Sequence, residues 1–274
     1  MDKLKGFVDI HIHTSPDIRD RKLDDISAAK SARDAGMTAI VIKSHITLTA
    51  DRAAIAQKMV PDIKVFGSLV LNDYVGGINP LAAEAAVKLG AKIIWLPTVS
   101  AMNHKRFHKE EGGIYLLAED GKVIPELIDI LNIIAENDCV LATGHISTQE
   151  IFKIVPIAKG LGVNKIVITH PEVPWISMSI DEQRKILDYD VFFERCYVST
   201  LDIGGGVPLG IITDAISDLG VGSTIISTDF GASVLDTPAV GFREYIGVLS
   251  RSGFSESDII IMGIKNPSNI LGIN

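Results

Sequence analysis

Short runs of apolar residues alternate with longer amphipathic stretches along nearly the whole chain. The runs are continuously apolar, which is typical of parallel strands that helices cover on the outside. Between them, polar residues and glycines stand where helices are expected to begin and end. The pattern predicts eight strands, at 7–13, 38–42, 64–71, 91–96, 139–143, 165–169, 191–197 and 224–228.

Helix-capping residues support this assignment. Gly36 follows an amphipathic stretch as a left-handed C-cap, and Asn79 with Pro80 forms an N-terminal signal. Serine and glutamate stand three residues apart at 147–150 and at 179–182, which is the spacing of a capping box. We expect helices at 24–35, 49–59, 80–90, 125–136 and 208–219. One further helix is expected after each capping box, and two more after the last strand.

Eight strand–helix units without a long linker favour a single (β/α)8 barrel over an open doubly wound sheet. The length of 274 residues fits, because one such barrel takes roughly 250 residues. A dinucleotide-binding sheet is disfavoured, since no glycine-rich phosphate loop follows the first strand. Gly204-Gly205-Gly206, after the seventh strand, either lines a phosphate or only adds flexibility. The expected architecture is one α/β domain over 1–274, a TIM barrel.

One segment breaks this rhythm. Residues 97–124 contain a polar cluster at 103–108 and then two apolar stretches across Asp120-Gly121. An Asp-Gly pair between apolar stretches predicts a hairpin, so we expect a hairpin insertion after the fourth strand. Because insertions of this length are often lids, we also expect 97–124 to cover the barrel mouth and to move.

Composition narrows the choice of function. An apolar content of 47% and a charged content of 22% indicate a soluble globular chain with a large core. The net charge of -8 disfavours nucleic acid and anionic membranes as partners. Cys139 and Cys196 fall in predicted strands and are expected to be buried thiols, not a disulfide. With no leader peptide and no apolar run near the roughly 18 residues of a membrane span, the expected location is the cytoplasm.

Histidines gather at the ends of predicted strands. His11 and His13 end the first strand, and alternate strand residues face the same side, so both imidazoles can reach one ion. The pair alone is also compatible with chance. His145, His170 and Asp229, however, follow the fifth, sixth and eighth strands. Barrel strands converge on one mouth at their C-terminal ends, and imidazole suits Zn, Fe, Ni or Cu, so we predict a metal site there.

These residues resemble the amidohydrolase superfamily of metal-dependent hydrolases, which are TIM barrels. The resemblance rests on the His-x-His of the first strand, the single histidines after the fifth and sixth, and the aspartate after the eighth. The tail at 266–272, Asn-Pro-Ser-Asn-Ile-Leu-Gly, is similar to the Asn-Pro-Ala-x-x-Leu-Gly helix that often closes those barrels. The resemblance covers nearly the whole chain.

The resemblance implies a role for each of these five residues. His11, His13 and Asp229 would bind the more buried metal, and Asp229 would also take the proton from a metal-activated water. His145 and His170 would bind a second metal, or in a mononuclear site one of them would contact substrate or water. The implied cofactor is one or two divalent transition-metal ions, with zinc as the first choice.

The sequence departs from the family pattern at the metal bridge. Many binuclear members use a carboxylated lysine or a glutamate, most often from the fourth strand, where this chain has neither. Lys43, after the second strand, has three interpretations: a bridging carbamate, a cation that holds an anionic substrate group, or a solvated rim lysine. We expect the cation that holds a substrate group. Glu194 in the seventh strand either faces the mouth or pairs with Arg195 or another cation. His45 is a further ligand or a substrate contact.

Clues to the substrate are cationic and aromatic. Arg19 and Arg21 fall on the loop after the first strand. Guanidinium groups bind carboxylate or phosphate with two parallel bonds, although ordinary surface charge explains either arginine equally well. Trp95 and Trp175 lie near strand ends and either wall a pocket or belong to the core.

The expected activity is hydrolysis of a C–N bond (amide, lactam or cyclic imide) or an ester bond in a small, anionic substrate. The enzyme is also compatible with homo-oligomerisation. One alternative is a decarboxylase or isomerase of the same superfamily, since these use the same ligands. Another is a small-phosphoester hydrolase. A non-catalytic metal-binding protein comes last, because structural zinc sites rely on thiolates and no cysteine is expected in this set.

Overall fold

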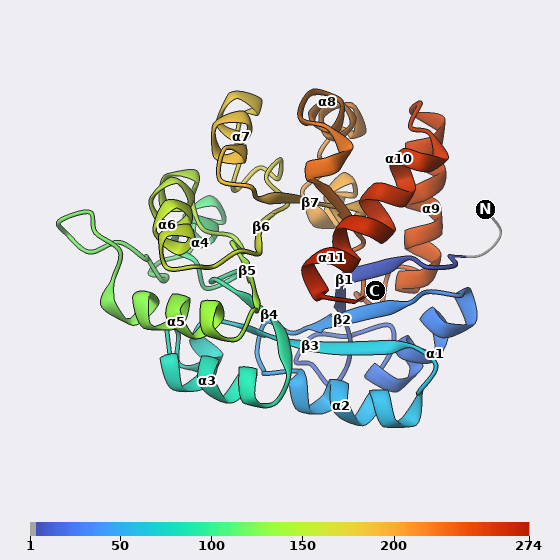
Figure 1. The fold of residues 1–274 in the computed structure, drawn as a ribbon, viewed down its shortest axis with the longest axis horizontal. Coiled ribbons are helices and arrows are strands. Elements are labelled where there is room, and N and C mark those ends of the chain that lie inside the picture. Colours follow the sequence, from blue (N-terminus) through green and yellow to red (C-terminus); the bar gives the residue numbers. More distant parts are fainter. Residues whose placement is uncertain (1–3, 274) are drawn as a thin grey trace.

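The computed structural model describes residues 4–273, which contain one sheet of eight parallel strands in the order β1 to β8. Helices surround the strands on the outside (Figure 1). The predicted (β/α)8 barrel is therefore confirmed. The strands are β1 (Val8–His13), β2 (Ala39–Lys43), β3 (Lys64–Val70), β4 (Ala91–Trp95), β5 (Val140–Ala142), β6 (Ile166–Thr169), β7 (Phe192–Cys196) and β8 (Thr224–Ser227).

The α-helices agree closely with the capping signals in the sequence. Gly36 ends the first helix with a left-handed φ of 89°, and both predicted capping boxes are present. The helices are α1 (Asp25–Ala35), α2 (Ala50–Met59), α3 (Pro80–Lys88), α4 (Met102–Phe107), α5 (Pro125–Glu136), α6 (Thr148–Gly160), α7 (Ile180–Leu187), α8 (Leu209–Leu219), α9 (Pro238–Arg251), α10 (Glu256–Ile260) and α11 (Asn266–Leu271). Among the described residues, no helix is both long and apolar enough to cross a membrane.

The barrel closes where β8 meets β1. Ile12 and Phe230 form an isolated parallel bridge, and the amide of His13 donates to the carbonyl of Phe230 at 2.8 Å. The amide of Asp229 donates to the carbonyl of His11, also at 2.8 Å. The residues just after β8 are thereby fixed against the end of β1, as a closed barrel requires.

The apolar core has two layers. One fills the barrel interior and includes Val8, Ile10 and Trp95, together with Ile270 and Leu271 from α11. Helix α11 lies beside β1 (Figure 1), and its apolar side chains close the end of the barrel where the strands begin. The larger layer lies between the strands and the outer helices. Trp95 is fully buried, so it belongs to the core and not to a pocket wall.

Two segments differ from the prediction. The 97–124 insertion contains the short helix α4, and its hairpin is reduced to one antiparallel bridge between Leu117 and Val123 across the Asp120-Gly121 turn. A hairpin with strands of its own is therefore not confirmed. At the end of the chain, two helices were expected after β8, but a π-helical turn at Ile261–Lys265 joins α10 to α11 after α9. A proline follows this turn in the first turn of α11, where its missing N–H is tolerated.

Candidate metal centre

A bulge in β1 aims the two histidines into the barrel. The pairing of β1 with β2 shifts register between Asp9 and Ile12. Ile10, before the shift, packs in the barrel interior, whereas Ile12 packs in the outer layer against the helices. Bulges change which side of a strand a residue faces. His11 and His13 therefore point inward at the mouth, and the prediction that they share a face is confirmed.

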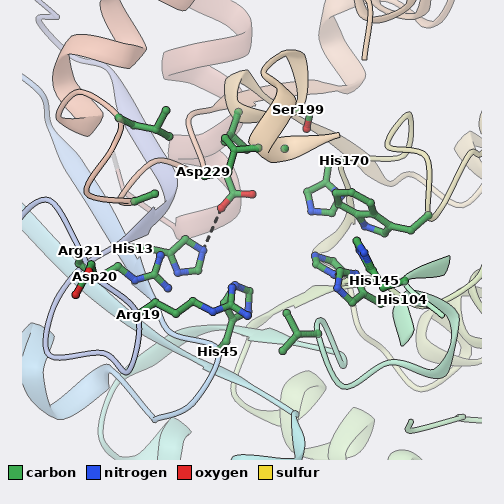
Figure 2. Close-up of a pocket in the computed structure, with 18 residues that line it drawn as sticks. His13, Arg19, Asp20, Arg21, His45, His104, His145, His170, Ser199 and Asp229 are labelled. Atoms are coloured by element: carbon green, nitrogen blue, oxygen red, sulfur yellow. Dashed lines mark hydrogen bonds and ion pairs between the residues drawn. The ribbon is translucent and has the colours of Figure 1, made fainter. Parts of the chain in front are cut away.

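His11 and His13 converge on one carboxylate oxygen. Nε2 of His11 lies 2.9 Å from Oδ1 of Asp229, and Nε2 of His13 lies 3.0 Å from the same atom. Figure 2 shows His13 and Asp229 joined across the cavity. Two ligands held at the usual zinc distance are themselves roughly 3 Å apart. The three ligand atoms lie within 4.8 Å of one another, so this donor set fits a single ion.

The protonation states of three of the residues suit a metal, whereas the pKa of His11 is raised, because Asp229 and Glu194 outweigh the lowering effect of burial. Burial lowers the pKa of His13 to about 3 and that of His170 to about 4, so both imidazoles are neutral at pH 7. Burial alone would raise the pKa of Asp229, but His11 and His13 hold it well below the usual range. A divalent ion requires neutral imidazole and ionised carboxylate.

Two of the residues after strands have strained backbones. Asp229 has φ 54° and His170 has φ 28°, in the left-handed region that side chains rarely adopt. Such conformations cost on the order of 1–3 kcal/mol each and cluster at functional sites. Here the strain turns both side chains back over the barrel mouth.

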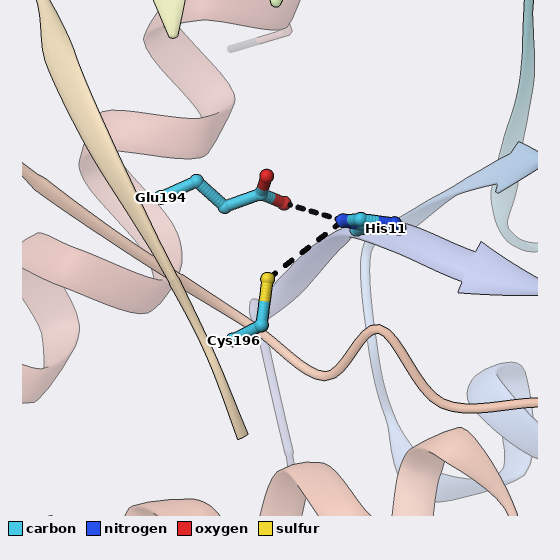
Figure 3. Close-up of side chains that lie close together, drawn as sticks. All are labelled: His11, Glu194 and Cys196. Atoms are coloured by element: carbon cyan, nitrogen blue, oxygen red, sulfur yellow. Dashed lines mark hydrogen bonds and ion pairs between the residues drawn. The ribbon is translucent and has the colours of Figure 1, made fainter. Parts of the chain in front are cut away.

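Glu194 lies beneath the pair and contacts His11. Its Oε1 lies 3.0 Å from Nδ1 of His11 and accepts a hydrogen bond from Ser227 Oγ at 2.8 Å. This contact leaves Nε2 of His11 facing Asp229, and a carboxylate on the second ring nitrogen is the usual partner of a metal-binding histidine. Figure 3 shows the arrangement, with the Cys196 thiol 3.7 Å from the same nitrogen.

Glu194 and Cys196 settle two expectations. Glu194 faces the site and does not pair with Arg195, which bonds to Gln183 and lies 3.2 Å from Glu172. No cysteine was expected among the ligands, and the structure places the Cys196 thiol close to His11 and Glu194. Cys196 stands two residues after Glu194 on β7, and therefore on the same face of that strand. This spacing could have identified it from the sequence.

Lys43 is buried inside the barrel. Its side chain is only 1% exposed, and Nζ lies 2.9 Å from Nε2 of His11 and 5.1 Å from the centre of the Trp95 ring. Burial lowers the pKa of Lys43, while the nearby carboxylates of Asp229 and Glu194 act in the opposite sense. The interpretation as a solvated rim lysine is therefore wrong.

The remaining histidines face one another across the cavity. The rings of His145 and His170 are 4.9 Å apart, and those of His13 and His45 are 4.7 Å apart and stacked. His45 Nδ1 lies 2.9 Å from Thr98 Oγ1, which anchors its ring at the rim. The Nδ1 atom of His170 is buried and has no partner among the described residues.

The insertion contributes a histidine whose contact with the site was not foreseen. His104 on α4 places Nδ1 2.9 Å from Nδ1 of His145, so one ring donates to the other. The preceding Asn103 donates from Nδ2 to the carbonyls of His145 and Trp175. Helix α4 is thus bonded to the two loops that follow β5 and β6. The register of this loop helix depends on long-range contacts, which a sequence pattern does not report.

These groups open into one cavity of about 330 Å³. Lys43, Glu194, His11 and Cys196 lie beneath it and do not line it. The predicted site residues that do line it are His13, Arg19, Arg21, His45, His145, His170 and Asp229.

Solved structures share this fold. A phosphotriesterase homology protein from Escherichia coli, complexed with phosphate in its active site, is 14% identical over 97% of this chain and 99% of its own, with a TM-score of 0.64. An organophosphorus hydrolase from Deinococcus radiodurans is 12% identical over 99% and 94%, with a TM-score of 0.64. A 2,6-dihydroxybenzoate decarboxylase from Rhizobium is 13% identical over 98% and 99%, with a TM-score of 0.58. At these identities the likeness confirms the fold, a (β/α)8 barrel.

Sequence comparison gives a narrower grouping. No match was found among curated proteins. A family model described as "Family of unknown function (DUF6282)" matches residues 6–194. The match contains His11, His13, His145 and His170, and it ends before Asp229. Because it covers more than half of the 274 residues, the chain belongs to the DUF6282 family.

Proposed function

We propose that the chain is a metal-dependent hydrolase that cleaves a C–N or ester bond of a small, anionic substrate. The observation that carries this proposal is the convergence of His11 and His13 on Oδ1 of Asp229 at the barrel mouth. Barrel enzymes place their catalytic groups at this end. Two of the proteins with a similar fold are hydrolases by name or by homology to one, which supports the same activity class.

His11, His13 and Asp229 would hold the first ion. His145 and His170 would hold a second one, or in a mononuclear site would contact the substrate. We propose zinc, because imidazole with carboxylate is its usual ligand set in catalytic sites. When bound, such an ion supplies Lewis acidity and lowers the pKa of a coordinated water to about 7.

The residues of the chain would handle the proton. Asp229 directs one oxygen at the two histidines, and Figure 2 shows its other oxygen directed into the cavity. Its side chain is 18% exposed, so water and substrate can reach it. A carboxylate that is ionised and within hydrogen-bond reach of water can accept a proton and return it to the leaving group. Glu194 would keep the His11 ring in the orientation that this arrangement needs.

Decarboxylation is the second candidate function. The observation in its favour is the fold likeness to 2,6-dihydroxybenzoate decarboxylase, together with the lack of a carboxylate or lysine after β4 to bridge two metals. A hydrolase consumes water and releases a titratable acid, whereas a decarboxylase releases carbon dioxide. We also propose a cytoplasmic location, since Cys139 and Cys196 are both free thiols. We also propose that the chain can form homo-oligomers.

The proposed function is tested by metal analysis and product analysis together. Protein purified without chelator is expected to carry one or two equivalents of metal, and added Zn, Mn, Co or Ni should raise its melting temperature, because a ligand that binds only the folded state stabilises it. The purified protein is then incubated with lactones, amides, cyclic imides and organophosphate esters. Less than about a tenth of an equivalent of metal, with no gain in stability on adding any of these ions, would contradict the proposal. Carbon dioxide release without acid formation would favour the decarboxylase.

A further inference from the structure

The cavity above the metal centre has two unlike walls. One wall comes from the loop after β1 and carries the side chains of Arg19 and Arg21. Figure 2 shows Arg19 and Arg21 on one side of the cavity and His104, His145 and His170 on the other. Ala232 forms a bridge with Arg21, so it lies on the arginine side together with Leu235. The opposite wall includes Trp175 and Ile203, which lie close to each other.

The two arginines differ in their availability. Arg21 donates from Nε and Nη2 to Oδ2 of Asp17, at 3.0 and 2.8 Å, and its side chain is only 6% exposed. Its charge is therefore already paired. The guanidinium of Arg19 makes no hydrogen bond or ion pair within residues 4–273, so it is the one of the two that can bind an anion.

The charge of Arg19 lies over the cavity. Arg19 lines the same cavity as His45 and His104. These histidines stand on different loops, after β2 and in the insertion. Figure 2 shows Arg19 beside His45, on the side of the cavity away from His104. Guanidinium groups bind carboxylate and phosphate oxygens with paired hydrogen bonds.

The opposite wall is closely packed. Gly205 has a left-handed φ of 114°, and a side chain there would come within 2.8 Å of Pro174 and 3.3 Å of Trp175. The glycine at this position thus lets the loop after β7 close against the indole. Of the two interpretations of the glycine run, neither phosphate binding nor flexibility describes Gly205. Ser199, in the same loop region, lines the cavity with a buried hydroxyl that has no partner among the described residues.

We propose that the substrate carries an oxyanion, a carboxylate or a phosphate, on an apolar body. Arg19 binds the oxyanion, the apolar body packs against Trp175 and Ile203, and the Ser199 hydroxyl bonds to a polar atom between them. This inference rests on the proposed function, because it names the substrate class of the same site. An apolar body fits the apolar wall by removing its exposed surface from water.

The test is binding of three matched probes, and of acetate as a carboxylate without the ring, to the full chain, measured by titration calorimetry. Benzoate and phenylphosphonate carry the two oxyanions on the same ring, and benzyl alcohol is their neutral counterpart. The variant is Arg19→Gln, and the control is Arg106→Gln, which removes an equal charge from an exposed residue of the same mouth that does not line the cavity. Metal content is measured for each protein, so that binding is compared between samples with the same amount of bound metal.

The expected result is that Arg19→Gln weakens binding of at least one oxyanion by about tenfold or more, as for loss of a charge-assisted hydrogen bond, and leaves benzyl alcohol unchanged. Arg106→Gln should bind as the unaltered chain does. Ile203→Ser, on the wall with Trp175, should weaken binding of benzoate but not of acetate. Equal binding by the two arginine variants, no binding of any probe to the unaltered chain, or acetate binding as tightly as benzoate would overturn the inference. A chain that carries no metal and gains no stability from any added ion, but still shows the Arg19 effect, would contradict the proposed function and leave this site standing.

Discussion

Oε1 of Glu194 lies 3.0 Å from Nδ1 of His11, although 183 positions separate the two residues in the chain. The contact joins β7 to β1, which lie on either side of β8, and it is fully buried at both ends. It determines which nitrogen of His11 faces Asp229 and thus which nitrogen is available to a metal. The partner of a metal-binding histidine tunes affinity through this kind of contact.

The first prediction follows from that contact. In Glu194→Gln the negative charge beneath His11 is lost, and metal affinity should fall by about 10- to 100-fold, the usual effect of removing such a partner. Affinity is measured by competition with a chelator of known strength. Glu126→Gln, on the exposed first turn of α5, is the matched control. Equal affinity in both variants would show that Glu194 does not hold the ligand.

The second prediction concerns Lys43. The direction in which metal content changes when Lys43 is replaced distinguishes its two remaining interpretations, a substrate-holding cation and a bridging carbamate. An unmodified ammonium 2.9 Å from Nε2 of His11 repels a cation at that nitrogen. Lys43→Met should therefore keep or strengthen metal binding, while turnover falls because the positive charge beside His11 is lost. Metal content and turnover are measured on the same sample. If Lys43 were a bridging carbamate, the variant would instead lose its second metal and recover it when a short carboxylic acid is added.

The barrel and most of its site could be predicted from the sequence because the decisive signals are local. Continuous apolar runs marked the strands, caps such as Gly36 marked helix ends, and polar residues after strands marked the mouth. The direction of the β1 side chains was less secure, because the bulge between Asp9 and Ile12 depends on pairing with β2. A one-residue shift in a strand reverses every side chain beyond it.

The unpredicted parts of the site depend on contacts between distant segments. The bond from His104 to His145 needs helix α4 to dock on the loop after β5. Gly205 packs against Trp175, although the whole of α7 lies between the two residues in the sequence. Lys43 was known to lie near the mouth, but its depth in the barrel follows from packing against Trp95. No spacing rule in the sequence reports these distances.

The third prediction concerns the insertion. His104→Phe keeps an aromatic ring but removes the bond to His145, so helix α4 should detach more readily and the chain should be cleaved faster by trypsin after Lys105, Arg106 or Lys109. His108→Phe, on the neighbouring turn, is the control, since no bond between His108 and His145 is present in the described structure. A substrate analogue should slow cleavage of the unaltered chain if 97–124 moves as a lid. Identical cleavage in all three proteins, with and without the analogue, would contradict this role.

Asp229 provides the most direct test of the mechanism. Its Oδ1 faces both His11 and His13, and its backbone, which has a left-handed φ, donates a hydrogen bond from the amide to the carbonyl of His11. Asparagine keeps the size of the side chain and a coordinating oxygen, and it tolerates a left-handed φ better than most residues. Asp229→Asn should therefore keep its fold and much of its metal. Because the amide cannot accept the proton, turnover should fall by roughly 10² to 10⁴, the usual share of general acid–base catalysis. Melting temperature, metal content and turnover of the variant are compared with those of Asp236→Asn, a substitution in the loop beyond the cavity lining. A variant that binds metal and retains near-normal turnover would exclude Asp229 as the base, and the proton would then have to pass to one of the cavity histidines.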